Sequence, residues 1–365
     1  MTNQKLYEIA LTLVPGIGDV NGKKLVAYCG GAEAVFCEKK KALTQISGIN
    51  NKLVKGIGSK DVMLRAEEEL SFIEKHDIKP LFYLDQDYPK RLQHCHDSPM
   101  MLYYKGNADL NAAKTIGVVG TRNITEYGKY VTEKIIEDLS SDNVLIISGL
   151  AYGVDSASHR AALKYDLATV GVLGHGMQTI YPAENRNLST KMLEKGGILT
   201  EYVSGTRPEK ENFPKRNRVV AGMVDCLVVI ESALKGGAMI TADIANSYDR
   251  EVFAIPGKIG DYYSEGCNHL IKTNKANLLT CATDIRYVMR WDVDTKVVVK
   301  QMRLFRDFSE DEQKVMNVFE NNSVIHLDDI IVGTDLTPTK IASVLLSLEF
   351  DGVLTALPGK RYQKL

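Results

Sequence analysis

Six short apolar runs, each followed by a stretch with helical periodicity, occupy the middle of the 365-residue chain. Their sequences are TIGVVG (115–120), VLIISG (144–149), TVGVLG (169–174), GILTEY (197–202), CLVVIE (226–231) and EVFAIPG (251–257). Continuous apolar strands separated by helices indicate a parallel sheet that is covered on both faces. The pattern therefore predicts an α/β domain with a parallel sheet over residues 76–290.

Residues 1–75 have a different character, with helix-like stretches separated by glycine-containing turns. The form Pro/Ser-Gly-Ile followed by a lysine-bearing helix occurs twice, at residues 15–17 and 47–49. A helical domain of the helix-hairpin-helix or SAM-like type is expected, in which the hairpin glycines let backbone N–H groups face a phosphate. A small helical domain whose glycines only make tight turns fits the pattern equally well, so both interpretations stay open.

The strand-helix alternation stops at residue 291, and residues 291–304 are predicted to be a linker. Residues 305–365 then supply three helices and a hairpin, the composition of a winged-helix-like domain. Its first helix opens with Ser309 and acidic residues, as expected at a helix N-terminus. The expected recognition helix carries only Lys340 as a cation, so a protein-contact or ancillary role is favoured over reading duplex DNA.

The formal net charge of -1 excludes nucleic-acid binding driven by the charge of the whole chain. Any such binding has to come from a local basic patch. The six cysteines are scattered without metal-ligand spacing, which predicts reduced thiols and neither a metal site nor a cofactor. The sequence shows no secretory signal and no apolar run of the ~18–20 residues that a membrane span needs, so a soluble, cytoplasmic protein is expected.

Glycine ends four of the six apolar runs, and three of these glycines are Gly120, Gly149 and Gly174. In open α/β sheets the carboxyl ends of the strands line the ligand crevice, so the site is expected at the loops that follow. The turn Gly120-Thr121-Arg122 matches neither the dinucleotide fingerprint nor the phosphate loop of ATPases. Its arginine can donate two hydrogen bonds to phosphate oxygens.

Several residues near the strand ends are predicted to line this crevice. They are Ser148, Gly149, Asp155, Gly174, Gly176, Gly237 and Thr241. Asp155 and His159 lie four residues apart on one helix face, which fits an acid–base pair, but no third partner completes a metal site or a triad. A helix-capping role for Asp155 and a hydrogen-bonded His159 beneath the loop are therefore favoured.

Residues 205–218 carry five cations against two acids, hence a local charge of +3. The cations are Arg207, Lys210, Lys215, Arg216 and Arg218. Cations at a helix N-terminus are disfavoured by the helix dipole, so a merely solvated helix start fits poorly. Phe213 among these cations is what single-stranded nucleic acid requires, because cations track phosphates while an aromatic face stacks on a base for ~1–3 kcal/mol.

Seven segments follow one another in a fixed order along the chain. They are GTR (120–122), SGLAYGVDSASH (148–159), YPAEN (181–185), FPKRNRVVAG (213–222), GGAMITA (236–242), FAIPG (253–257) and SEGCNHLI (264–271). In this order and spacing they resemble the DNA-processing protein A family, DprA/Smf, over essentially all of residues 80–285. Two positions depart from the family pattern, since Tyr152 stands where many members have Arg and Asp249 where Gly is usual.

The resemblance implies an extended Rossmann-like domain that binds single-stranded DNA and delivers it to the RecA recombinase during natural transformation. It also implies protection of incoming strands, relief of the barrier set by single-strand-binding protein, homodimerisation and no catalytic activity. The family's DNA pocket, together with Lys215 of the basic segment, gives a set of predicted DNA-binding residues. They are Gly120, Thr121, Arg122, Lys210, Phe213, Lys215, Arg216, Asn217 and Arg218.

A nucleotide-processing enzyme is the alternative function. The segment GGAMIT (236–241) is similar to a helix start in lysine-decarboxylase-like phosphoribohydrolases. Their longer PGGxGTxxE signature ends in a catalytic Glu, and Ala245 occupies the corresponding distance here. A binding protein is therefore favoured over an enzyme.

Overall fold

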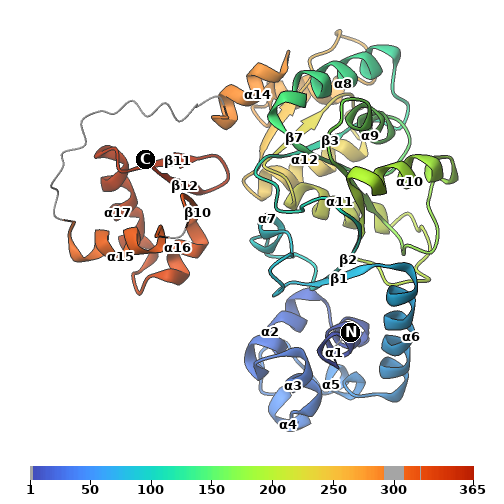
Figure 1. Ribbon diagram of the computed structural model, residues 1–365, viewed down its shortest axis with the longest axis vertical. Coiled ribbons are helices and arrows are strands. Elements are labelled where there is room, and N and C mark those ends of the chain that lie inside the picture. Colours follow the sequence, from blue (N-terminus) through green and yellow to red (C-terminus); the bar gives the residue numbers. More distant parts are fainter. Residues whose placement is uncertain (1–2, 292–307, 321) are drawn as a thin grey trace.

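The computed structural model describes residues 3–291, 308–320 and 322–365 of the chain. Apart from Trp291, the predicted linker at 291–304 lies outside these residues. Figure 1 shows three units: the N-terminal helices at the bottom, the large sheet domain above them, and a small C-terminal unit to the left. The order of the units in space thus follows their order along the chain.

Over the described residues, a nine-stranded sheet runs in the order β1-β2-β6-β5-β4-β3-β7-β8-β9. The strands are β1 (Lys79–Phe82), β2 (Met101–Gly106), β3 (Thr115–Val119), β4 (Leu145–Ser148), β5 (Thr169–Leu173), β6 (Gly197–Thr200), β7 (Cys226–Val229), β8 (Glu251–Ala254) and β9 (Asn277–Leu278). The six predicted runs form β3 to β8, and these strands are parallel, which confirms the α/β, Rossmann-like class. The antiparallel strands β1 and β2 extend one edge and were not predicted.

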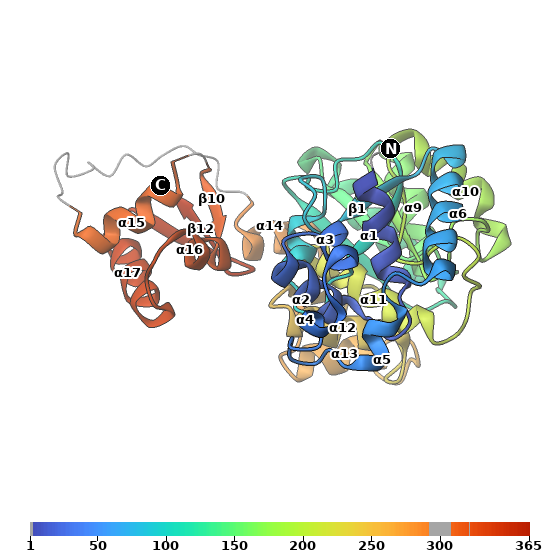
Figure 2. The ribbon, with the colours of Figure 1, turned by 90° about the horizontal axis from the view of Figure 1, so that it is seen from below.

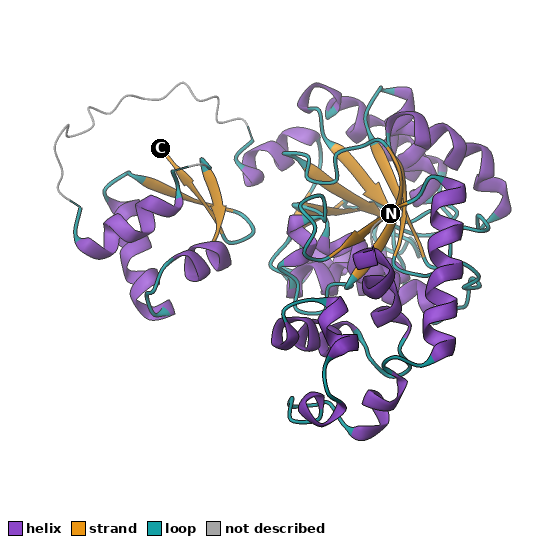
Figure 3. Cartoon of the chain, turned by 60° about the horizontal axis from the view of Figure 1, so that its bottom comes forward, coloured by secondary structure: helices purple, strands orange, loops and turns teal. Residues whose placement is uncertain are grey.

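Helices cover both faces of the sheet, as Figure 3 shows. One face packs against α8 (Glu126–Asp138), α9 (Val154–Lys164) and α14 (Ala282–Met289). The other packs against α7 (Lys90–Gln93), α11 (Asn212–Gly222), α12 (Gly237–Ser247) and α13 (Glu265–Lys272). The remaining elements are α10 (Arg186–Lys195) and the short 3-10 helices η1 (Ser140–Asp142) and η2 (Ala183–Asn185). Successive residues of a strand face opposite sides of the sheet. Because the strands are continuous apolar runs, both faces of the sheet are apolar and are buried under helices.

Six helices form the N-terminal unit from residue 3 onward. They are α1 (Asn3–Leu13), α2 (Asp19–Cys29), α3 (Ala32–Cys37), α4 (Lys40–Leu43), α5 (Asn51–Gly56) and α6 (Lys60–His76). Both predicted hairpin turns are present, and Gly16 and Gly48 adopt φ values of +83° and +89°, in the left-handed region that favours glycine. Asn50 caps α5 by accepting the N–H of Lys52 (3.0 Å) and of Leu53 (3.1 Å), so the second hairpin starts its helix with a side chain.

The N-terminal helices share one apolar core with the edge of the sheet. Leu25 of α2 and Ile73 of α6 lie in the same buried cluster as Phe82 of β1 and Met101 of β2. This contact explains why the unpredicted edge strands are present, since they cover apolar surface on the helices. The N-terminal unit is therefore packed onto the sheet domain.

The C-terminal unit has the winged-helix fold, which confirms the prediction. Its elements are α15 (Glu310–Val318), β10 (Val324–His326), α16 (Leu327–Gly333), α17 (Pro338–Phe350), β11 (Leu354–Leu357) and β12 (Arg361–Lys364). The antiparallel strands run in the order β10-β12-β11, and Figure 2 shows the domain to one side of the main body. No single helix in the described part of the chain is long and apolar enough to cross a membrane, and α16 and α17 reach those limits only together, as a pair bent by 116°.

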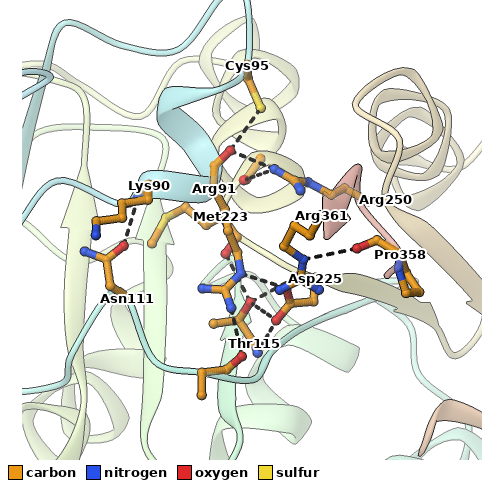
Figure 4. Close-up of polar contacts among 12 residues, drawn as sticks. Lys90, Arg91, Cys95, Asn111, Thr115, Met223, Asp225, Arg250, Pro358 and Arg361 are labelled. Atoms are coloured by element: carbon orange, nitrogen blue, oxygen red, sulfur yellow. Dashed lines mark hydrogen bonds and ion pairs between the residues drawn. The ribbon is translucent and has the colours of Figure 1, made fainter. Parts of the chain in front are cut away.

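The wing of this domain contacts the sheet domain through a buried carboxylate. Asp225, just before β7, is 3% exposed and accepts the backbone N–H of Thr115 at 2.9 Å. Arg91 of α7 and Arg361 of β12 reach the same carboxylate at 2.8 and 3.0 Å (Figure 4). Burial acts to raise the pKa of Asp225, but the two arginines outweigh it and hold that pKa below its usual value.

Replacing Asp225 by Asn should lower the free energy of unfolding by about 3 kcal/mol, because it leaves partly buried arginines without their counter-charge. Urea denaturation of the full chain, followed by circular dichroism, measures this loss. Asp243→Asn is the matched control, since the Asp243–Lys275 pair at 2.8 Å is exposed and such pairs contribute ~0–1 kcal/mol. Equal losses in the two variants would contradict the role assigned to Asp225.

Candidate nucleic-acid interface

The loops after β3, β4 and β5 surround a small pocket that opens to solvent. Its remaining wall comes from the start of α11. The lining residues are Arg122, Leu150, Ala151, Tyr152, Val172, Leu173, Gly174, His175, Tyr181, Pro182, Phe213 and Arg216. The pocket lies at the carboxyl edge of the sheet, where the sequence predicted the crevice, and it joins Arg122 to Phe213 of the basic segment.

The turn that carries Arg122 is fixed by backbone hydrogen bonds on both sides. The N–H of Thr121 donates to the Glu231 carbonyl (2.8 Å), and the N–H of Val154 donates to the Thr121 carbonyl (3.1 Å). Gly153 has a φ of +76°, and a Cβ there would lie 2.1 Å from the Thr121 carbonyl oxygen, so this close approach requires glycine. The turn presents Arg122 to solvent, with no carboxylate at ion-pair distance among the described residues.

Phe213 lies between Arg122 and Tyr181 at the pocket. The guanidinium carbon of Arg122 is 5.5 Å from the centroid of the Phe213 ring, within cation–π distance. The Tyr181 ring is 6.0 Å away, centroid to centroid, with the planes at 39°. The ring packs against Gly174, where a Cβ would come within 3.0 Å of it. These side chains form a mixed aromatic and cationic surface that suits a nucleobase beside a phosphate.

Arg216, which was predicted to bind DNA, lies at the bottom of the pocket and is only 5% exposed. Its Nη1 donates to the Val172 carbonyl, and its Nε donates to Asn217 Oδ1 at 3.2 Å. Gly149 makes room for Arg216 and Asp155, since a Cβ there would lie 2.6 Å from the guanidinium and 2.3 Å from the carboxylate. Burial lowers the pKa of Arg216 and raises that of Asp155, and each charge opposes the shift of the other.

Arg218 points away from the pocket, toward the N-terminal helices. Its guanidinium pairs with Glu201 and, at 3.3 Å, with Asp19 of α2, and it donates to the Asp97 carbonyl. Burial raises the pKa of Glu201 to about 7, and the charge of Arg218 opposes this shift. The predicted phosphate contact of Arg218 is therefore corrected, because its guanidinium joins the sheet domain to the N-terminal unit.

The remaining predicted cations, Lys210 and Lys215, are exposed and make no ion pair within the described ranges. Lys210 lies in the loop before α11, and Lys215 lies in the first turn of that helix. Asn217 is partly buried and accepts from the Arg216 guanidinium. Three predicted cations, Arg122, Lys210 and Lys215, are thus available to a ligand.

Of the residues predicted to line the crevice, only Gly174 is part of the pocket wall. Six residues predicted to line the crevice are absent from the pocket wall: Ser148, Gly149, Asp155, Gly176, Gly237 and Thr241. Ser148 is fully buried and donates to the Val118 carbonyl at 2.6 Å, while Thr241 donates to the Gly237 carbonyl at 3.2 Å within α12. Five of these six residues are buried beneath the loops that follow their strands or within a helix, whereas Gly237 is exposed at the start of α12. None of the six therefore lines this pocket.

The structural role favoured for His159 is confirmed. The ring is fully buried, with Nδ1 2.6 Å from Thr169 Oγ1 and Nε2 2.5 Å from the Gly149 carbonyl oxygen. Burial lowers the pKa of His159 to about 4, so the ring is neutral near pH 7. It therefore supports the β4 loop rather than acting on a ligand.

Two exposed tyrosines that were not predicted as site residues line the pocket. Tyr152 and Tyr181 are 43% and 45% exposed, and the Tyr152 hydroxyl donates to Glu184 at 2.7 Å. Both follow strand-end glycines, Gly149 and Gly174, by a few residues. The sequence signal that could have identified them as pocket residues is an aromatic side chain in a loop that follows a strand end.

Comparison with known proteins identifies the family. Residues 79–290 match the family model of DNA recombination-mediator protein A, and residues 306–360 match that of the DprA winged helix domain. Protein Smf of Synechocystis sp. is 30% identical over 99% of this chain and 99% of its own length. The DNA processing protein DprA of Streptococcus pneumoniae is 40% identical over 55% of this chain and 71% of its own length.

Two solved structures agree with these matches. DNA processing protein A from Streptococcus pneumoniae has a TM-score of 0.66 at 34% identity, covering 79% of this chain and 98% of its own. DNA processing protein A from Helicobacter pylori, described with a unique single-stranded DNA binding mode, has a TM-score of 0.54 at 27% identity, covering 59% and 96%. The chain therefore belongs to the DNA processing protein A (DprA/Smf) family of DNA recombination mediators.

Proposed function

We propose that this chain binds single-stranded DNA in the pocket between Arg122 and Phe213 and acts on it by binding, without catalysis. The observation that carries the proposal is the aromatic ring of Phe213 lying 5.5 Å from an exposed guanidinium that has no carboxylate partner among the described residues. Cations neutralise phosphates while a ring stacks on a base, and the pocket supplies both. The single-stranded DNA binding described for the Helicobacter pylori relative supports the same use of the site.

Each residue of the proposed DNA site, in the pocket or beside it, has a distinct role in this proposal. Arg122, Lys210 and Lys215 hold phosphates, and Phe213 stacks on a base. Arg216 forms the floor of the site, with Asp155 as its counter-charge. Gly120, Thr121 and Asn217 position these groups.

We further propose that the protein works as a homodimer in the cytoplasm. There it protects incoming single strands, relieves the barrier set by single-strand-binding protein, and loads RecA during natural transformation. Membership of a family of recombination mediators supports this role. The position expected for a phosphoribohydrolase Glu holds Ala245, which is fully buried in α12 and does not favour the enzyme alternative.

Reversing a charge in the pocket, at Arg122, or beside it, at Lys210, should weaken DNA binding at least tenfold, because repulsion of a phosphate replaces attraction. Arg122→Glu and Lys210→Glu test this in fluorescence anisotropy with labelled oligo-dT, with circular dichroism to verify the fold. The parent affinity should also fall with salt at a log–log slope of about -2, since three cations each contribute roughly -0.7.

Lys272→Glu is the matched control for these variants. It makes the same change in net charge on α13, outside the pocket lining, and should bind like the parent. Arg122→Glu binding as tightly as Lys272→Glu, or an affinity independent of salt, would contradict the proposed site.

Phe213→Ala should cost ~1–3 kcal/mol of binding free energy, about 5- to 150-fold in affinity, because the stacking surface is lost. Phe213→Trp should retain most of the affinity. The salt slope of Phe213→Ala should match that of the parent, since the cations remain. If Phe213→Ala binds DNA like the parent, the ring does not stack on a base.

The mediator role predicts an effect on RecA that depends on the pocket. The parent protein should shorten the lag of RecA-driven strand exchange on DNA coated with single-strand-binding protein, and Arg122→Glu should not. A parent protein that binds the strand but leaves the lag unchanged would contradict RecA loading and leave DNA binding intact.

A further inference from the structure

Two histidines from different domains stack where the winged-helix domain meets the sheet domain. His94 follows α7, and His326 ends β10. Their ring centroids are 3.9 Å apart with planes at 16°. Asp328 Oδ2 lies 3.8 Å from His94 Nδ1 and 3.6 Å from His326 Nδ1, and Asp329 Oδ2 lies 3.8 Å from His94 Nε2. Nitrogen and carboxylate donors from both sides of the domain boundary thus converge.

The spacing of these donors fits a metal ion. His94, His326 and Asp328 each offer one ligand atom, and these atoms lie within 4.8 Å of one another. A tetrahedral zinc ion with ligand distances of about 2.0–2.2 Å separates its ligand atoms by roughly 3.3–3.6 Å. The distances of 3.6 and 3.8 Å from Asp328 to the two rings are close to this range. The rings are stacked with their planes at 16°, so one of them has to rotate for both in-plane lone pairs to reach the same ion. Imidazole and carboxylate ligands suit Zn²⁺ and similar divalent transition metals.

The surroundings of the two rings also favour ligation. Nδ1 of His326 accepts the backbone N–H of Asp328 at 3.2 Å, so this nitrogen carries a lone pair rather than a proton, and a metal ion bound there replaces this hydrogen bond. His94 faces Asp328 with one nitrogen and Asp329 with the other. Metal-bound histidines commonly give their second ring N–H to a carboxylate, which orients the ring and raises its basicity. Asp329 is placed for that supporting role.

We propose that His94, His326 and Asp328 bind a divalent transition-metal ion, with Zn²⁺ as the best match, and that this ion clamps the winged-helix domain to the sheet domain. The ligand set is complete only when the two domains are in contact, so the ion stabilises the docked arrangement. Asp225–Arg361 (Figure 4) and Asp249–Lys360, at 2.7 Å, hold the same interface. The ion adds a contact that depends on the metal concentration to these ion pairs, which need no metal.

Isothermal titration calorimetry of the tag-free, full-length protein tests the site. Zn²⁺ should bind at one ion per chain, whereas Mg²⁺ should not compete, because it prefers oxygen ligands. His94→Ala and His326→Ala should each weaken Zn²⁺ binding at least tenfold, and Asp328→Asn should do so without removing a ring. His96→Ala is the matched control, since its ring packs 5.9 Å from that of Tyr248, outside the cluster, and it should bind like the parent.

Small-angle X-ray scattering tests the clamp. Asp225→Asn weakens the fixed part of the interface, so its radius of gyration should exceed that of the parent and fall when Zn²⁺ is added. The double variant Asp225→Asn, His326→Ala should stay expanded with Zn²⁺. Absence of saturable Zn²⁺ binding, or binding that persists in His94→Ala and His326→Ala, overturns the site, and a Zn²⁺-insensitive radius in Asp225→Asn overturns the clamp.

Discussion

One buried carboxylate, that of Asp225, contacts three parts of this structure: strand β3, helix α7 and the wing of the C-terminal domain. The carboxylate accepts the backbone N–H of Thr115, the first residue of β3, and so holds the start of this strand. It also receives Arg91 from the segment that leads into the antiparallel edge, and Arg361 from the wing. A charge taken out of water is tolerated only with all of its partners in place. The C-terminal domain and the start of β3 therefore share one buried carboxylate.

The strands that the sequence pattern predicted are those joined by helices. Parallel neighbours need a helical crossover, so an apolar run followed by a helix is a sufficient signal for β3 to β8. The antiparallel strands β1 and β2 need no such crossover, and the alternation does not mark them. Pro80, within β1, also argues against a strand in a sequence pattern, although an edge strand accepts it.

The sequence predicted which residue types form the site, but only partly which of their side chains point toward a ligand. A run of cations shows that a basic surface is present, and Arg122, Lys210 and Lys215 are exposed as expected. Arg216 and Arg218 are two residues apart on α11 and point in different directions, as helical geometry requires. Which of them faces a ligand depends on Asp19, which is 199 residues away in sequence and pairs with Arg218. Contacts of that separation leave no local trace in the sequence.

The apolar core that the N-terminal helices share with β1 and β2 decides where the chain can be divided. The family match begins at residue 79, the first residue of β1, yet Phe82, Met101 and Tyr103 are buried in one core with the N-terminal helices. Truncation at that point exposes a contiguous apolar patch of the kind that drives association. We therefore expect the N-terminal helices to unfold together with the sheet domain, because the boundary of the family model cuts through a shared core.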